Sequence, residues 1–159
     1  MIRMAKIDEL NTLDSIACKV INDMINCGIP QWNFDYPRKE HYLSDITENC
    51  LYVCGEDQVL GAICLKPQDD PPYNELDNWT HKESLVVHRV IVDPDSSRSG
   101  VAYEMFQFAE TVAKDLGFKS IKVDTHKENY KMNGFLKKLG YIEKGYLTSI
   151  DRIAFEKII

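Results

Sequence analysis

Apolar residues recur at three- and four-residue spacing along two long stretches of the chain, each closed by a glycine. This period is typical of amphipathic helices that bury one face. A shorter helix is expected after Pro37, which is tolerated at a first helical position, and another before Gly140. In chain order the predicted helices are residues 7–27, 39–46, 101–116 and 129–139.

Short apolar or β-branched runs between these helices predict strands. The strongest is SLVVHRVIV at residues 84–92, whose near-continuous apolarity predicts a central strand that is buried on both faces. Residues 50–54 and 59–65 flank a turn that begins at Gly55, which is typical of a hairpin. The remaining predicted strands are residues 2–6, 120–123, 141–146 and 152–156.

The alternation of strands and helices predicts one α/β domain over residues 1–159, with a mixed sheet and helices on both of its faces. Neither a repeat nor a linker interrupts the chain. Two segments that contain prolines, residues 29–38 and 66–82, are expected to be loops.

Charge and hydropathy restrict the partners. Asp and Glu number 25 against 19 Lys and Arg, for a formal charge of −6, and the chain has no dense basic stripe. This balance argues against nucleic acid as a partner, and an anionic cofactor would need local backbone dipoles and a few nearby cations. No apolar run approaches the roughly 18 residues of a membrane span. We therefore expect a soluble, cytoplasmic protein without a membrane partner.

The five cysteines are an odd number and include no CxxC pair. We interpret them as reduced structural thiols and expect no metal. Cys50 and Cys54 have even spacing on one predicted strand, so they could share a face.

The turn after the central strand carries the clearest chemistry. In VIVDPDSSRSGVA (residues 90–102) a helix begins where main-chain N–H groups lack intrahelical partners, and such an end attracts anions. Gly100 and Ala102 keep the approach free of large side chains. An ordinary serine-capped turn would have the same composition, so the turn alone leaves both interpretations open.

The chain resembles the GNAT acetyltransferase superfamily at two places. VDPDSSRSGVA is similar to its acetyl-CoA signature at Gly100 and Ala102, with Ser97 standing where the family usually has Arg or Gln. DTHKENYKMNGFLKKLGY resembles a second family segment, in which Asn129 and Gly140 are in register. The resemblance is strongest to small bacterial members that carry QWN, HR and DTH motifs. It implies a mostly antiparallel central sheet of about six to seven strands, and acetyl-CoA as co-substrate.

The same resemblance implies which residues bind acetyl-CoA. The pantetheine arm would pair with main-chain groups of Val90, Ile91 and Val92, and Asn129 would meet it from the other side. The phosphates would lie over the turn and the first helical residues, namely Ser97, Arg98, Ser99, Gly100, Val101 and Ala102.

The chain lacks the two catalytic side chains that are usual in the GNAT superfamily. Val86 stands where the family often has a glutamate base, and Leu136 where it has a tyrosine acid. His88 is two residues from Val86 and has an ordinary pKa of about 6.5, so it is the candidate base. A buried histidine held by hydrogen bonds is the alternative. The resemblance implies direct attack of an amine on the thioester.

Aromatic residues of the two loops could line an acceptor pocket or only fasten the loops. The candidates are Trp32, Tyr36, Tyr73 and Trp79. The acidic balance favours a cationic amine, on a small molecule or a peptide. A non-catalytic acyl-CoA-binding module is the competing function, and a homodimer through C-terminal strands is plausible within the family.

Overall fold

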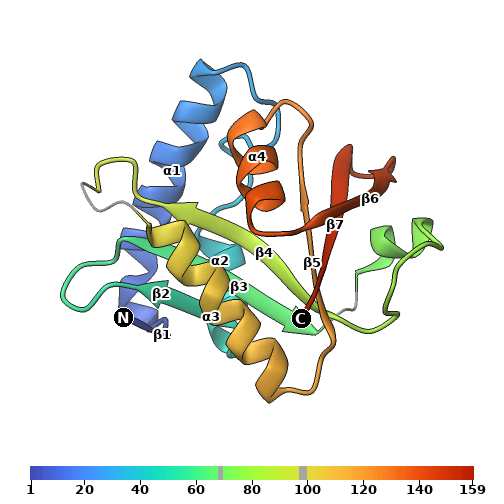
Figure 1. The fold of residues 1–159 in the computed structure, drawn as a ribbon. Helices are drawn as coiled ribbons and strands as arrows, with labels where there is room; N and C mark the ends of the chain where they lie inside the picture. Colours follow the sequence, from blue (N-terminus) through green and yellow to red (C-terminus); the bar gives the residue numbers. More distant parts are fainter. Residues whose placement is uncertain (68–69, 97–99) are drawn as a thin grey trace. The chain divides into compact units, whose positions relative to one another are not determined.

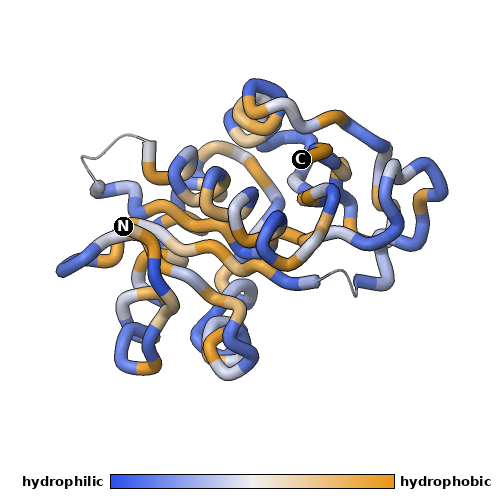
Figure 2. Tube along the Cα trace, turned by 60° about the horizontal axis from the view of Figure 1, so that its bottom comes forward, coloured by the Kyte–Doolittle hydropathy of each residue, from blue (hydrophilic) through white to orange (hydrophobic). Residues whose placement is uncertain are grey.

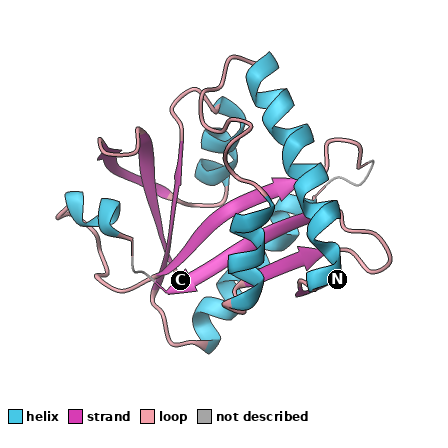
Figure 3. Cartoon of the chain, turned by 180° about the vertical axis from the view of Figure 1, so that it is seen from behind, coloured by secondary structure: helices cyan, strands magenta, loops and turns pink. Residues whose placement is uncertain are grey.

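The computed structural model describes residues 1–67, 70–96 and 100–159 and contains a helix or strand for each predicted one (Figures 1 and 3). The helices are α1 (Leu10–Asn26), α2 (Lys39–Thr47), α3 (Val101–Asp115) and α4 (Tyr130–Lys138). The strands are β1 (Ile2–Met4), β2 (Leu51–Cys54), β3 (Gly61–Pro67), β4 (Leu85–Val92), β5 (Ser120–Thr125), β6 (Ile142–Leu147) and β7 (Arg152–Ile158).

Two short 3-10 helices, Ile7–Glu9 and Pro71–Glu75, were not expected from the sequence. The first replaces the end of a predicted strand and the start of a predicted helix. The chain turns there because the Glu9 carboxylate accepts the Lys6 N–H (2.8 Å) and pairs with Arg3 (2.6 Å). Side-chain contacts across several residues thus override the local pattern.

The strands form one mixed sheet in the order β1-β2-β3-β4-β5-β7-β6. β4 and β5 run parallel, whereas the pairs β1–β2, β2–β3, β5–β7 and β6–β7 are antiparallel. The predicted fold class, a mixed and mostly antiparallel sheet with helices, is confirmed.

The contacts divide the chain into two compact units. Unit 1 comprises Met1–Leu65 and His88–Phe108, and unit 2 comprises Lys66–Val87 and Ala109–Ile159. β4 and α3 therefore contribute residues to each unit. A single domain over residues 1–159 stays a prediction, and the units are described separately below.

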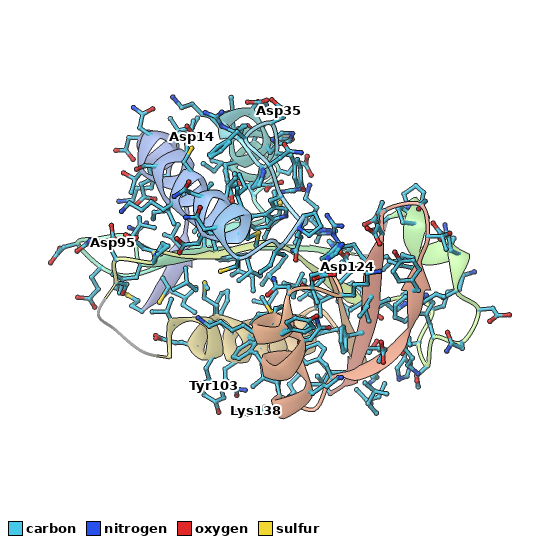
Figure 4. All side chains as sticks on the ribbon, turned by 90° about the horizontal axis from the view of Figure 1, so that it is seen from above. Asp14, Asp35, Asp95, Tyr103, Asp124 and Lys138 are labelled. Carbon is cyan, nitrogen blue, oxygen red and sulfur yellow. The ribbon has the colours of Figure 1, made fainter. Side chains whose placement is uncertain are left out.

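In unit 1 the two faces of the β2–β3 hairpin pack against different helices. Leu51 and Val53 belong to a buried cluster with residues of α1 and with Tyr42 of α2. On the opposite face the Tyr52 ring meets Phe108 of α3 edge-on, with centroids 4.9 Å apart. Figure 4 shows α1 and α2 on one side of these strands and the start of α3 on the other. The alternation of side chains along a strand makes this arrangement possible.

In unit 2 a segment that we call the strap, residues 70–82, is fastened to the strands at several points. The Glu75 carboxylate accepts the Thr148 N–H (2.9 Å) and the Ser149 hydroxyl. The Glu156 carboxylate accepts the N–H groups of Thr80 (2.7 Å) and His81 (3.1 Å). The sequence predicted a polar loop here, and one exposed carboxylate (Glu75) and one buried carboxylate (Glu156) anchor it to distant strands, which no local pattern could reveal.

The hydropathy of the trace follows this packing: strands are mostly hydrophobic and the connecting turns mostly hydrophilic (Figure 2). Within the described parts of the chain, no helix has the length and apolar character needed to cross a bilayer.

Candidate functional site

The second half of β4 is irregular. Only Leu85, Val86 and Val87 of β4 are paired with β5 in the parallel ladder of the described residues, whereas β4 itself continues to Val92. Arg89 has a φ of +46°, which is rare for a long side chain and costs about 1–2 kcal/mol. The backbone is therefore bent in the middle of the strand whose C-terminal half carries the predicted pantetheine contacts. Of those residues Ile91 is buried, while Val90 and Val92 are partly exposed.

A buried ion pair holds Arg89 in this conformation. Its guanidinium binds both carboxylate oxygens of Asp45, from α2, at 2.6 and 2.5 Å. The Tyr36 hydroxyl accepts a third hydrogen bond from it at 2.9 Å. The Asp45 side chain is 1% exposed and that of Arg89 is 14% exposed, so solvent screens this pair little. Helix α2 and the aromatic loop thus fix the bend in β4.

The turn after β4 is open at its glycine. Gly100 has a φ of +87°, and no atom of another described residue would lie within 4 Å of a Cβ there. α3 begins at Val101, so the N–H groups of its first turn point out of the helix end. Ala102 adds only a methyl group. Ser97, Arg98 and Ser99, which were also predicted to contact phosphates, lie outside the described residues.

A lysine from α1 lies beside the same turn. Lys19 Nζ is 3.3 Å from Asp93 Oδ1 and 2.8 Å from Asp95 Oδ2 (Asp95 is labelled in Figure 4). The Asp95 N–H closes the turn on Asp93 Oδ1 (3.0 Å). Lys19 offsets two negative charges beside the predicted anion site. The sequence gives no signal for this lysine, because a single lysine on a helix carries no motif.

The residues at the family's usual catalytic positions are buried and apolar. Val86 belongs to a core cluster with Tyr73, Leu147 and Ala154. Leu136 on α4 is fully buried. His88 is partly buried on β4, next to Arg89. Its role as a base stays a prediction.

Each of the four loop aromatics is fastened within its own unit. Trp32 lies in the core of unit 1, and the Tyr36 ring meets His41 edge-on as well as bonding Arg89. In unit 2 Tyr73 is fully buried, and the Trp79 indole N–H donates to its carbonyl (2.8 Å). These contacts support the alternative that the aromatics fasten the loops, and acceptor contacts stay a prediction.

Asp124, near the end of β5, makes the least expected contact in unit 2 (Figure 4). The hydroxyl of Tyr73 donates to its Oδ2 at 2.7 Å, and Arg152 Nε lies 3.9 Å from its Oδ1. Burial raises the pKa of the Asp124 carboxyl, whereas the Tyr73 hydrogen bond and the Arg152 charge act in the opposite direction. The DTH motif contains Asp124 but gave no role for it.

Asn129 begins α4. Its side-chain oxygen accepts the Met132 N–H (3.2 Å), and its carbonyl accepts a hydrogen bond from the Asn133 side chain (2.8 Å). The His126 ring accepts the Glu128 N–H (3.0 Å) and lies 3.1 Å from the Asp151 carboxylate. Asn129 is therefore held in place as a helix cap, and its contact with a cofactor stays a prediction.

In the described parts of the chain, which include all five cysteines, no disulfide is formed. The expectation that Cys50 and Cys54 share a face is wrong, because β2 begins only at Leu51. Cys50 Sγ lies 3.5 Å from Cys64 Sγ, whereas Cys54 Sγ lies 3.8 Å from the Glu104 carboxylate. Asp45, Cys50 and Cys64 could in principle surround a metal ion, but Arg89 already occupies both oxygens of Asp45. We assign no metal to this cluster.

The chain is similar to known proteins in sequence and in fold. The model of the GNAT acetyltransferase family matches residues 19–141. An acetyltransferase of that family from Streptococcus agalactiae has a similar structure, with a TM-score of 0.90 and 23% identity over 100% of this chain and 95% of the other. The PaiA N-acetyltransferase of Thermoplasma acidophilum, solved with coenzyme A, is similar with a TM-score of 0.74 and 19% identity, over 100% of this chain and 98% of the other.

One curated relative is similar in sequence. Human N-acetyltransferase 8B is 26% identical over 111 residues, which are 65% of this chain. This chain spans 46% of the length of that relative.

Proposed function

The chain belongs to the GNAT acetyltransferase family, and on that premise we propose that it transfers an acetyl group from acetyl-CoA to a primary amine. The acceptor is a small molecule or a peptide. The observation that carries the proposal is Gly100, which precedes the first residue of α3 and has no atom of another described residue within 4 Å of a Cβ placed there.

The donor side has the chemistry that a pyrophosphate needs. Main-chain N–H groups at Gly100, Val101 and Ala102 attract anions, and the helix dipole adds about 0.3–1 kcal/mol per contact. By sequence, Ser97, Arg98 and Ser99 continue this cradle. Lys19 offsets the nearby carboxylates of Asp93 and Asp95.

The pantetheine arm would pair with Val90, Ile91 and Val92, as in the family, and Asn129 is a further candidate contact by the same resemblance. The bend at Arg89 supports this, because a bent strand exposes main-chain groups that a regular ladder would use. The Thermoplasma relative was solved with coenzyme A.

The reaction forms a C–N bond and breaks the C–S bond of the thioester. The acceptor ammonium must first lose a proton, which costs about 4.6 kcal/mol at pH 7 for a pKa of about 10.4. His88 is one candidate to receive it. The departing thiolate, with a pKa of about 8.5, leaves without full protonation, so the apolar Leu136 does not prevent turnover.

On the acceptor side we propose a cationic amine, in keeping with the acidic balance of the chain. The candidate contacts from the sequence are Trp32, Tyr36, Tyr73 and Trp79. Neither nucleic acid nor a membrane is a proposed partner, and the proposed location is the cytoplasm. A homodimer could form through β6, which ends the sheet and exposes Ile142. A non-catalytic acyl-CoA-binding module is the second candidate, favoured by Val86 and Leu136.

The donor site is tested by acetyl-CoA-induced thermal stabilisation of two matched variants. Gly100→Asp places a negative charge at the predicted phosphate site and should abolish the shift in melting temperature. Gly28→Asp, at another glycine with positive φ and no neighbour within 4 Å, should keep it. No binding to the natural chain at millimolar acetyl-CoA, or equal shifts in both variants, would refute the proposed site.

Thiol release with a polyamine, an aminoglycoside and a peptide with a free N-terminus separates an enzyme from a binding module. Thermal stabilisation by acetyl-CoA without thiol release with any of these amines would favour the module. For an active enzyme, unchanged turnover of His88→Gln across pH would remove His88 from the mechanism.

A further inference from the structure

Val86 has no carboxylate to act as a base, but unit 2 contains other carboxylates that could. Glu75 and Glu156 are occupied as anchors of the strap. Glu156 accepts a further hydrogen bond from the Ser120 hydroxyl at 2.8 Å. Asp124 differs, because it is bonded through one oxygen only.

The position of Asp124 along β5 suits a catalytic group. The β4–β5 ladder ends at the pair Val87 and Val123, and Asp124 is the next residue of β5. Open α/β sheets bind ligands at the carboxyl ends of their strands, and Asp124 is the second-last residue of β5. The Asp124 side chain remains 18% exposed, so a small amine can reach it.

The contacts of Asp124 orient one oxygen and leave the other available. Tyr73 OH binds Oδ2 at 2.7 Å. Arg152 Nε is 3.9 Å from Oδ1, beyond hydrogen-bond distance. Among the residues that the structure describes, no other donor reaches either oxygen. Tyr73 therefore fixes the carboxylate while Oδ1 can accept a proton.

We propose that Asp124 is the general base on the acceptor side and that Tyr73 is the residue that positions it. This inference rests on the proposed acetyl transfer. Asp124 Oδ1 takes the proton from the acceptor ammonium, the freed nitrogen lone pair forms the C–N bond to the acetyl carbon, and the C–S electron pair leaves with the coenzyme A thiolate. The proton later passes from Asp124 to water.

The groups around Asp124 predict that substitutions of Tyr73 and Asp70 shift the acidic limb of the kcat/KM profile in opposite directions. Burial and the neighbouring Asp70 raise the pKa of Asp124, while Tyr73 and Arg152 lower it. Tyr73→Phe should therefore move the acidic limb of the kcat/KM profile upward, by about one pH unit for the loss of one charge-assisted hydrogen bond. Asp70→Asn should move the same limb downward.

Asp124→Asn should lower kcat/KM by about 10²–10⁴-fold and remove the acidic limb, with a smaller effect on the KM for acetyl-CoA. Tyr141→Phe is the matched control for Tyr73→Phe: it removes another buried tyrosine hydroxyl of unit 2, and the limb should stay in place. A purely structural role for Tyr73 would change melting temperature and kcat without moving the limb.

The decisive experiment combines these pH profiles, measured by thiol release with whichever amine turns over, with carbon-13 NMR titration of Asp124 in the free protein. Support requires a titration above the ordinary aspartate range in the natural chain and higher still in Tyr73→Phe. A titration at or below that range overturns the inference, even if Asp124→Asn fails to fold. Turnover by the natural chain with an unchanged limb in Asp124→Asn overturns it while leaving the proposed function intact. Absence of turnover with every amine refutes the proposed enzymatic function and this inference with it.

Discussion

The ion pair between Asp45 and Arg89 should be the most costly charged contact in unit 1 to break. Asp45→Asn keeps the shape of the side chain but removes the charge that faces a guanidinium only 14% exposed. Breaking a buried pair by removing one partner typically costs about 3–5 kcal/mol, because the remaining charge is uncompensated. Because asparagine retains one acceptor oxygen, we expect Asp45→Asn to lower the free energy of unfolding by about 3 kcal/mol, the lower end of this range.

The chain contains a matched control. Asp14, labelled in Figure 4, forms the same bidentate pair with Arg38: Nε and Nη2 of the guanidinium donate to the two carboxylate oxygens at 3.0 and 3.2 Å. The Arg38 side chain is 37% exposed, so the Asp14→Asn variant should lose only about 0.2–1 kcal/mol. The two variants compare one chemistry at two degrees of burial.

Urea and thermal unfolding at pH 7 measure the difference. At about 2–4 °C per kcal/mol for a domain of this size, Asp45→Asn should lower the melting temperature by about 6–12 °C and Asp14→Asn by about 4 °C or less. Raising the salt concentration should weaken the Asp14 contribution and leave the Asp45 contribution almost unchanged. Equal costs for the two variants would refute the claim that burial makes the Arg89 pair important, and with it the account of how β4 is held bent.

Two further variants test single features. Lys122 is fully buried, with its ammonium 4.4 Å from the centroid of the Trp79 ring, and burial lowers its pKa to about 8 from 10.5. Between pH 8 and 10.5 the unfolded chain thus binds more protons than the folded chain, so the free energy of unfolding should rise with pH in this window. Lys122→Met should abolish that rise and stabilise the protein at pH 7 by at most about 3 kcal/mol. A natural chain whose free energy of unfolding is flat over this window would contradict the lowered pKa. Gly55→Ala should cost more than about 2 kcal/mol in urea unfolding, because its Cβ would lie 1.9 Å from the Gln58 carbonyl oxygen. Gly28→Ala, at a φ of +69° and with no described atom within 4 Å of the added Cβ, should cost only about 1 kcal/mol. An equal cost for both variants would show that the contact with the Gln58 carbonyl oxygen is not what makes Gly55 sensitive.

The sequence by itself determined the order and type of the main elements. Hydrophobic period fixed α1 and α3, and the apolar run of residues 84–92 fixed β4, because these patterns depend only on which faces are buried. It also located the turn at Gly100, since a glycine after a strand and before a helix is a local signal. The two family motifs then gave the fold and the donor site as expectations.

Only the tertiary structure brought distant residues together. Asp45 and Arg89 are 44 positions apart, and Tyr73 and Asp124 are 51 apart, so no local pattern relates either pair. Lys19 likewise reaches the turn after β4 from a separate helix. A polar side chain acquires its partner and its degree of burial from the packing of whole elements. That is why the position of the donor turn could be predicted from the sequence, whereas the bend of β4 and the carboxylate at the end of β5 became visible only in the fold.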